Sequence, residues 1–545
     1  MKTRRLLSLF LAALLLGAGV LLLSGALLRP GQVLADGATT SPRRAVPTVQ
    51  PLPRRTAPAS EPTVEAASEP TTRPSRRAAV LSETAKASVA TSAPSEAASA
   101  APPVTTLNPP LVAPASVAPA FADHLRTLLR TPAPGAHGCV AVTVLDPRGR
   151  TVLDGRGDEP MLPASTQKLL TAASALAVLE PEHRFVTRLK ATSRPRRGVL
   201  RGDLVLVGSG DPTLATATYR AILPDRPATP LEALAHAVVA RGIRVVRGRV
   251  IGDPSVFRHR AEPLGWPDFY VEAGISPKVS GLTVDGGRQL YTKAGRLESR
   301  PAARPAQHTA ELLVRLLRER GVRVRGRASV QRESPAAPVA VGRVVSPPLR
   351  VLLAHTVTTS DNHMADAIFA TVGTARGRPT WSGSARSARA ALRPLGLPWE
   401  GVASFDGSGL SRRDRLTTRF LAHLQDRMGR TAFAPLWASL QAVAGESGTL
   451  RNRMDDTVAH GRVRGKTGYL RDTRALAAMA TGGKRRRAAF AVIGNELDTK
   501  GQQAVQVRTD LVAIALVQRL RGCRLSAAPR RVDAPLPPGA RRCRR

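Results

Sequence analysis

Residues 161–179 read MLPASTQKLLTAASALAVL, and this stretch predicts a helix that carries two candidate catalytic side chains. Ala and Leu dominate it, and a proline stands just before its first turn, as is typical of a helix N-terminus. Ser165 and Lys168 are three positions apart, so their side chains share one helix face. A neutral lysine amine can take the proton of a hydroxyl, which makes Ser165 a candidate nucleophile and Lys168 its base. The alternative is an N-cap serine beside a surface lysine.

The rarity of lysine gives this pair additional weight. Only nine of the 81 Lys and Arg residues are lysine, so the chain uses arginine at most positions that need a cation. Arginine stays protonated in proteins, whereas a buried lysine can give up its proton. We therefore single out Lys168 and Lys466, because each lies in a candidate motif.

A second candidate group is Ser360-Asp361-Asn362, between a short apolar run and a segment that predicts a helix. The Ser360 hydroxyl could relay a proton between Lys168 and a leaving group. The Asn362 amide could hold a substrate carbonyl. The alternative is a helix cap, which these residue types also favour.

A third group, Lys466-Thr467-Gly468, lies at the edge of a predicted strand near the end of the chain. A strand edge can pair with an extended peptide, and glycine lets that peptide approach closely. Lys466 supplies positive potential, and Thr467 supplies a hydroxyl for an anionic group. Taken alone, the pattern also fits an ordinary strand with a glycine bulge.

The other periodic segments predict an α+β body, in which helices and an antiparallel sheet share one core. A turn at 146–149 joins two short strands into a hairpin. The predicted helices are 121–130, 165–179, 231–241, 309–320 and 502–520, and the predicted strands are 140–145, 150–153, 204–207, 245–251, 322–330, 462–465, 475–480 and 488–493.

The formal net charge of +41 indicates a polyanionic neighbour. Nucleic acid is a poor match, because the arginines are scattered, aromatic residues make up only 3% of the chain, and no nucleic-acid-binding motif is present. An anionic envelope polymer or membrane surface fits the charge better. A general bias toward arginine fits it equally well.

The three cysteines show no metal-ligand spacing, and no phosphate-binding loop is present, so we expect no metal and no cofactor. If one pair is oxidised, Cys139–Cys523 is preferred, because Cys543 lies in a basic tail. Three free thiols are the alternative.

Composition divides the chain into four regions. Residues 1–35 combine basic residues with a long apolar run, which predicts a signal peptide or a signal-anchor helix and hence an extracytoplasmic, envelope-bound or secreted protein. Residues 36–118 are rich in Pro, Ala, Ser and Thr and predict a disordered tether. Residues 119–524 form the folded body, and 525–545 predict a basic disordered tail.

The three motifs, in this order on a helix, a loop and a late strand, resemble the signature of penicillin-binding proteins and serine β-lactamases. Ser165 and Ser360 are 195 residues apart, which resembles the low-molecular-mass class C penicillin-binding proteins, the D-alanyl-D-alanine carboxypeptidase/endopeptidase family. Further matches lie at 207–214, 406–411 and 448–450. The resemblance covers about residues 121 to 521. It implies a penicillin-binding-protein/β-lactamase-like transpeptidase fold, with a domain inserted at about 190–345.

The resemblance also implies an activity. Ser165 would attack the D-Ala-D-Ala bond of a peptidoglycan stem peptide, Lys168 would act as base, and Ser360 would relay a proton to the leaving D-Ala. Asn362 would position the substrate, and Lys466 and Thr467 would bind its carboxylate beside Gly468.

The backbone N–H groups of Ser165 and Tyr469 would stabilise the oxyanion. β-Lactam antibiotics would acylate Ser165 as covalent inhibitors. Tyr469 departs from the family pattern, which has Thr or Ser there, so a small hydroxyl for the carboxylate is lost. A β-lactamase-like hydrolase and a catalytically silent wall-binding scaffold remain as alternatives.

Overall fold

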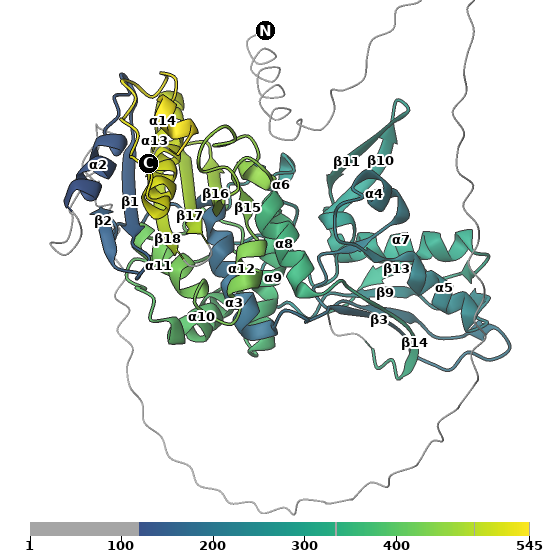
Figure 1. Ribbon diagram of the computed structural model, residues 1–545. Helices are drawn as coiled ribbons and strands as arrows, with labels where there is room; N and C mark the ends of the chain where they lie inside the picture. The colour runs from purple at the N-terminus through teal and green to yellow at the C-terminus, as the bar shows by residue number, and fades with distance from the viewer. Residues whose placement is uncertain (1–118, 333–334, 484–485, 544–545) are drawn as a thin grey trace, which may run out of the picture. The chain divides into compact units, whose positions relative to one another are not determined.

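Six strands form the central antiparallel sheet of the computed structural model, which describes residues 119–332, 335–483 and 486–543 (Figure 1). In spatial order they are β15 (Ala442–Val443), β16 (Val463–Leu470), β17 (Thr473–Gly483), β18 (Arg486–Asn495), β1 (Cys139–Leu145) and β2 (Thr151–Gly155). The predicted hairpin is β1–β2, and the three predicted late strands are β16, β17 and β18. Strands from both ends of the chain thus meet at the β1–β18 pair.

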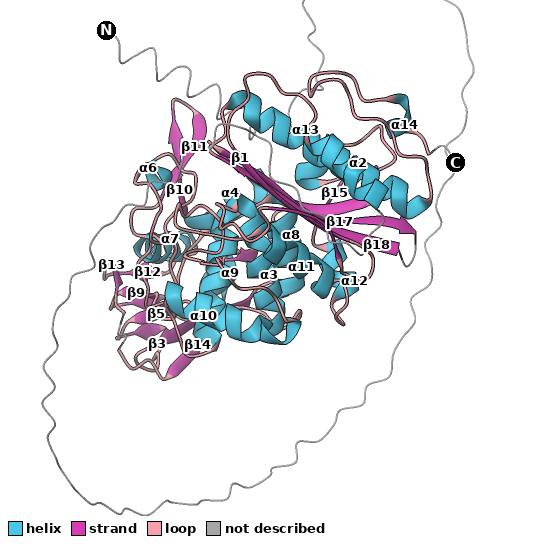
Figure 2. Ribbon diagram, turned by 90° about the vertical axis from the view of Figure 1, so that its left-hand side faces the viewer, coloured by secondary structure: helices cyan, strands magenta, loops and turns pink. Residues whose placement is uncertain are grey.

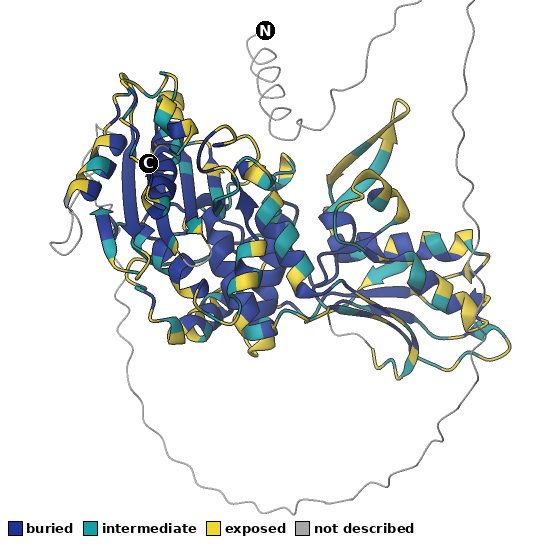
Figure 3. Cartoon of the chain, viewed as in Figure 1, coloured by how far each residue is buried: buried dark blue, intermediate teal, exposed yellow. Residues whose placement is uncertain are grey.

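Helices cover both faces of this sheet, which confirms the α+β prediction. Two of them, α2 (Pro119–Leu129) and α13 (Thr499–Arg521), pack on one face (Figure 2). The other face carries α3 (Gln167–Leu179), α8 (Leu349–Thr359), α9 (Asn362–Ala375), α10 (Trp381–Leu392), α11 (Thr418–Met428) and α12 (Ala434–Ser439). Figure 3 shows most of the central strands coloured as buried, and the side chains of the sheet belong to two hydrophobic cores, as expected for a layer between them.

The segment between the first two motifs builds its own sheet and core. Its five-stranded sheet has the order β13 (Ala328–Val330), β9 (Val250–Asp253), β5 (Leu204–Val207), β3 (Val186–Ala191) and β14 (Val339–Val345). Its helices are α4 (Ala217–Ile222), α5 (Glu232–Ala240), α6 (Phe269–Glu272) and α7 (Pro305–Glu319). Smaller sheets join β12 (Arg323–Val324), β8 (Val245–Val246) and β4 (Val199–Leu200), then β10 (Arg288–Lys293) with β11 (Arg296–Pro301), and β6 (Leu214–Ala215) with β7 (Thr229–Pro230).

Two strands predicted in this segment, 245–251 and 322–330, are each broken into two. The first splits into β8 and β9, and the second into β12 and β13, so each crosses from one sheet to another. The breaks fall at Gly248 and Gly326, whose backbones touch: a Cβ on Gly326 would lie 2.3 Å from the Gly248 carbonyl oxygen. The apolar pattern of the sequence continues across both breaks, so the sequence does not indicate where each strand ends.

The disulfide prediction was wrong. Cys523 pairs with Cys543, and Cys139 is a buried free thiol. Cys139 lies on β1, and Cys523 follows α13. The prediction paired Cys523 with Cys139 and set aside Cys543, which is its actual partner. The basic tail is also more ordered than predicted, because the bond ties it back and a short helix, α14 (Pro538–Arg541), buries Ala540 against the α13 side of the core.

The predicted export segment and tether lie outside the described residues. Within residues 119–543, apart from the two short gaps, no helix is long and apolar enough to cross a membrane.

Candidate active site

Ser165 lies in a single 3-10 turn, Ala164–Thr166, that leads into α3. The turn is under local constraint, since Ala164 has a φ of 45°, in the left-handed region that residues with a side chain rarely adopt. Two glycines let other backbones pack against it. A Cβ on Gly409 would lie 1.8 Å from the Ala164 oxygen, and one on Gly468 would lie 2.7 Å from the Pro163 oxygen. The third motif is thereby placed directly against the turn of the first.

Lys168 is fully buried beneath Ser165, and its ammonium group has three acceptors. Its Nζ lies 2.9 Å from Ser165 Oγ, 2.8 Å from Asn362 Oδ1 and 2.7 Å from the Ser408 carbonyl oxygen. Burial lowers the pKa of Lys168 to about 8, while the carboxyl groups of nearby buried aspartates act in the opposite direction. A neutral Lys168 amine can accept the Ser165 proton, so the geometry matches a nucleophile and its base.

Those aspartates form a buried carboxyl cluster behind Lys168, consisting of Asp366, Asp406 and Asp414. Asp406 accepts backbone N–H bonds from Ser408 and Gly409 at 3.0 and 2.6 Å, which fixes the loop whose carbonyl holds Lys168. Burial, followed by the charge of Asp406, raises the pKa of Asp366 and of Asp414 well above the usual range. Those two groups therefore favour the neutral acid, which limits the negative charge that would keep Lys168 protonated.

The second motif lies at the junction between α8 and α9. Ser360 ends α8 in the left-handed conformation, with φ 68° and ψ 36°, and Asn362 begins α9. Asn362 connects the site to the inserted region, because its Nδ2 donates to the Ile275 oxygen at 3.3 Å while its Oδ1 accepts from Lys168. The Ser360 hydroxyl makes no hydrogen bond with any described residue and is free to bind a substrate or relay a proton.

Asp361, between these two residues, performs a structural task. Its Oδ1 caps α9 by accepting the Met364 N–H at 2.9 Å. Its Oδ2 forms an ion pair with Arg226 of the inserted region and lies 3.6 Å from His355. The inserted region thus holds the second motif from two sides, through Ile275 and Arg226.

The third motif lies on β16, where Lys466 and Gly468 are buried while Tyr469 is 61% exposed. Strand β15 pairs with β16 only at Arg464 and Gly465. The pairing with β15 therefore stops just before Lys466, the first residue of the third motif. Thr467 donates a hydrogen bond to Thr449, one of the family-like residues at 448–450, over 2.8 Å. Burial, with a smaller contribution from Lys168, lowers the pKa of Lys466 well below its usual value.

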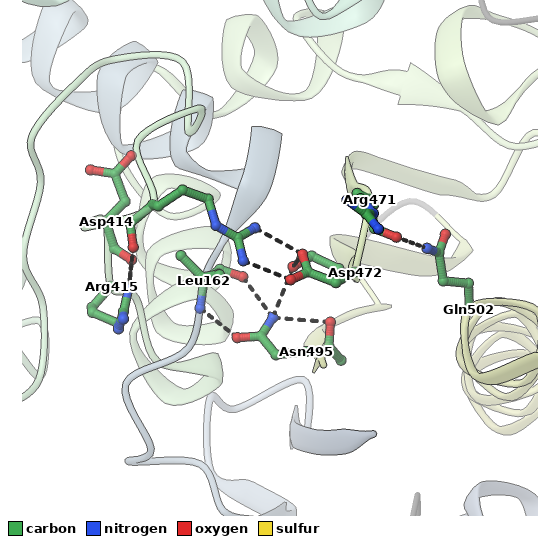
Figure 4. A network of polar contacts seen from close by, with 10 residues as sticks. Leu162, Asp414, Arg415, Arg471, Asp472, Asn495 and Gln502 are labelled. Carbon is green, nitrogen blue, oxygen red and sulfur yellow. Dashed lines mark hydrogen bonds and ion pairs between the residues drawn. The ribbon is translucent and has the colours of Figure 1, made fainter. Parts of the chain in front are cut away.

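A polar network clamps the segments that carry these motifs (Figure 4). The Asn495 side chain bonds both backbone groups of Leu162, with its Oδ1 2.7 Å from the nitrogen and its Nδ2 3.1 Å from the oxygen. Arg412 forms two bonds with Asp472, of 2.8 and 2.6 Å, which tie the loop after Asp406 to the β16–β17 turn. The clamp therefore joins the approach to Ser165, the loop behind Lys168 and the third motif.

The structure brings Ser165, Lys168 and Asn362 into hydrogen-bond contact and places Gly468 against the turn that carries Ser165. Lys466 is close enough to Lys168 for their charges to interact. Thr467 and Tyr469 flank Gly468 on β16, and Ser360 lies two residues before Asn362. Sequence reasoning missed the parts played by the Ser408 carbonyl, Asp366, Asp414 and Arg226. The 406–411 match pointed to the loop but not to the backbone atom that holds Lys168. Among the described residues, no group of three or more His, Cys, Asp or Glu side chains is placed to hold a metal.

Comparison with known proteins gives one consistent match. The model of the D-Ala-D-Ala carboxypeptidase 3 (S13) family matches residues 121–301 and 291–516. A carboxypeptidase DacB from Mycolicibacterium smegmatis is 34% identical over 372 residues, covering 67% of this chain and 76% of that protein. A D-alanyl-D-alanine carboxypeptidase from Actinomadura sp. is 31% identical over 461 residues, covering 71% and 82%.

A solved structure, penicillin binding protein 4 (dacB) from Haemophilus influenzae, superposes with a TM-score of 0.60 at 21% identity, covering 73% of this chain and 98% of that one. At this identity the match supports the fold, and it agrees with the sheet and helix layers described above.

Proposed function

Because this chain belongs to the D-Ala-D-Ala carboxypeptidase 3 (S13) family, we propose that it cleaves peptidoglycan stem peptides through an acyl-enzyme formed on Ser165. The observation that carries the proposal is the 2.9 Å contact between Ser165 Oγ and the fully buried Lys168 amine. A buried lysine of lowered pKa beside a partly exposed serine is the arrangement that nucleophilic catalysis requires.

Acylation begins when Lys168 Nζ takes the Ser165 hydroxyl proton and Oγ attacks the carbonyl carbon of the penultimate D-Ala. The backbone N–H groups of Ser165 and Tyr469 stabilise the oxyanion. The C–N bond then breaks, and the leaving amine receives a proton from Lys168 through the Ser360 hydroxyl. Water hydrolyses the resulting ester, which returns a proton to Ser165 and releases the shortened peptide.

Substrate binding falls to Asn362 and to the edge of β16. The amide of Asn362 already bonds Lys168 and can turn to hold the stem-peptide backbone. Lys466 and Thr467 bind the terminal carboxylate, and the negative charge of that group raises the pKa of buried Lys466 toward its usual value. Gly468 keeps this edge of β16 against the turn that carries Ser165, since a Cβ there would lie 2.7 Å from the Pro163 oxygen.

The direct test of this function uses a stem pentapeptide that ends in D-Ala-D-Ala. We expect release of one D-Ala per peptide, measured by chromatography, and we expect prior treatment with penicillin to block it. A cross-linked dimer assayed in parallel separates carboxypeptidase from endopeptidase cleavage. Acylation by penicillin without cleavage of either peptide would contradict the proposal, and rapid penicillin turnover would favour a β-lactamase instead.

The acylation rate should depend on pH through Lys168. Only the neutral amine accepts a proton, so the rate constant kcat/KM, or the penicillin acylation rate, should rise with pH and level off above about 8. Below that pH we expect a slope of about tenfold per pH unit. Stopped-flow acylation with a chromogenic cephalosporin between pH 5.5 and 9.5 measures it. A rate that is flat or falls across this range would exclude Lys168 as the base.

Tyr469 should affect how well the site recognises the terminal carboxylate of the pentapeptide. Its exposed ring lies 4.6 Å from the Arg474 guanidinium, and it replaces the small hydroxyl that would bond a carboxylate. We expect Tyr469→Thr to raise D-Ala release from the pentapeptide by about tenfold, since a hydrogen bond to a charged group contributes about 1.5–3 kcal/mol. Tyr469→Phe is the control, because it keeps the ring and should leave the rate unchanged. Equal rates for Thr and Phe variants would remove Tyr469 from carboxylate recognition.

We also propose that the protein acts outside the cytoplasm, where peptidoglycan lies. The basic and apolar pattern of residues 1–35 supports this location. The high positive charge supports contact with anionic polymers of the envelope.

A further inference from the structure

A buried arginine of the inserted region reaches the second motif. Arg226 lies between α4 and β7, and its side chain is only 11% exposed. Its guanidinium group forms an ion pair with Asp361, whose side chain is 10% exposed and which directly follows Ser360 in the sequence. Exposed ion pairs contribute little, but a buried charge depends strongly on its partner. The pair is therefore an important link between the inserted region and the acylation centre.

The inserted region encloses the guanidinium group of Arg226. Its Nη2 donates to the Pro212 carbonyl oxygen at 3.5 Å, and its central carbon lies 5.9 Å from the centre of the Tyr219 ring. A Cβ on Gly286 would lie 3.5 Å from the same Nη2, so the backbone passes close by. These contacts fix Arg226 within the inserted region, and its ion pair transmits that fixed position to the second motif.

Ser360 depends on its backbone for its location. Its hydroxyl makes no hydrogen bond with any residue in the described ranges, so no side-chain contact orients it. Its φ of 68° and ψ of 36° lie in the left-handed region, which a residue with a side chain rarely adopts. Such a conformation persists only where the surrounding structure determines it.

Asp361 supplies that determination from three of its atoms. Its Oδ1 accepts the Met364 N–H at 2.9 Å, and its carbonyl oxygen accepts the Ala365 N–H at 3.2 Å. Both of these contacts lie within α9. Its Oδ2 faces Arg226, so the ion pair is the contact that orients this end of α9 from outside the helix.

His355 is no substitute for Arg226. Its Nε2 lies 3.6 Å from the same Asp361 oxygen. Burial, followed by the charge of Arg226, lowers the pKa of His355 to about 4, so the ring is neutral at neutral pH. A neutral ring does not balance the carboxylate charge, and the ion pair with Arg226 does.

We propose that Arg226 is a positioning residue for proton transfer to the leaving group, because its ion pair with Asp361 holds Ser360 where the hydroxyl can pass that proton. The inference rests on the proposed function. In this step the C–N bond of the tetrahedral intermediate breaks, the nitrogen takes the proton of Ser360 Oγ, and Oγ takes one from Lys168. An amine needs that proton in order to leave, whereas a thiolate leaves without one.

The test compares two leaving groups on the full-length protein. One substrate is the stem pentapeptide that ends in D-Ala-D-Ala. In the other, D-thiolactate replaces the last D-Ala, so a thioester replaces the amide and the terminal carboxylate is kept. We expect Arg226→Met to lower kcat/KM for the pentapeptide by at least about tenfold, and for the thioester by less than about threefold. Chromatography measures D-Ala release, and a thiol-reactive chromogen measures thiolactate release.

Arg249→Met is the matched control. It breaks an ion pair of the same inserted region, Arg249 with Asp203 at 3.2 Å, in which the arginine side chain is 45% exposed. Neither partner is part of the second motif or bonded to it. We expect this variant to cleave both substrates at the wild-type rate.

Ser360→Ala shows what loss of the relay itself does. This variant should favour the thioester as Arg226→Met does, and Arg226→Met/Ser360→Ala should be no slower than Ser360→Ala alone, because both changes remove one proton path. If Arg226→Met does not fold, Arg226→Met/Asp361→Asn decides the question. That variant leaves no unpaired buried charge, and asparagine still caps α9. It should show the same selective loss.

Three results would overturn the positioning role of Arg226: an equal fall for both substrates, no fall for the pentapeptide, or losses that add up in Arg226→Met/Ser360→Ala. An equal fall would indicate general damage to the site. A wild-type protein that cleaves neither substrate would instead contradict the proposed function itself.

Discussion

Replacing Ser165 with alanine is expected to lower stem-peptide cleavage by about 10⁴-fold or more, to the background of the assay. The loss is this large because no covalent intermediate can form without the Oγ atom. Stability should change little, since Ser165 is partly exposed and its hydroxyl bonds only Lys168. D-Ala release from the pentapeptide, with circular dichroism as the folding check, measures the effect.

Ser174→Ala provides the control for this variant. Ser174 lies on the same helix, α3, but it is fully buried and its hydroxyl bonds the helix's own Thr171 carbonyl at 3.0 Å. We expect this variant to keep nearly full activity. If Ser165→Ala retained a tenth of the wild-type rate, another residue would have to be the nucleophile.

Replacing Lys168 with methionine is expected to have the second-largest effect, a fall of about 10³-fold in the acylation rate. The methionine side chain has similar length but cannot accept a proton. Binding of the unreacted peptide should change less than the acylation rate, because Lys168 acts on the Ser165 proton. Stopped-flow acylation gives the rate, and the pH dependence of the residual rate should lose its rise toward pH 8.

Lys168→Arg separates charge from basicity. Arginine keeps the positive charge but stays protonated, so this variant should be as slow as Lys168→Met. The methionine variant should unfold at a lower temperature, because the Asn362 and Ser408 oxygens lose their shared donor, at a cost of about 1–3 kcal/mol each. The arginine variant keeps N–H donors, but its larger guanidinium group overpacks the same fully buried position. An arginine variant with near wild-type acylation would show that the charge, rather than proton transfer, is what the site needs.

The sequence predicted the site more fully than the surrounding fold. Ser165 and Lys168 could be paired from helical spacing alone, and the rarity of lysine marked Lys168 as a position where arginine would fail. Period and composition also located the hairpin and the late strands, because local patterns determine single elements.

Contacts between residues far apart in the sequence could not be predicted from local patterns. The Ser408 carbonyl that accepts a hydrogen bond from Lys168 is 240 positions away from it in the sequence. Arg226, which forms an ion pair with Asp361, lies in the inserted region. The breaks at Gly248 and Gly326 depend on two backbones meeting in space. Cys523 pairs with Cys543 because the tail folds back toward α13, and no local sequence pattern predicts that fold-back.

The assignment of Ser165 as the nucleophile is tested most directly by locating the penicillin adduct on the wild-type protein. The full-length chain is treated with penicillin, its intact mass is measured, and the digested protein is mapped by tandem mass spectrometry. We expect one penicilloyl group per chain, on the peptide that contains Ser165 and on that residue itself. An adduct on any other residue, or no adduct under conditions that label a known penicillin-binding protein, would contradict Ser165 as the nucleophile.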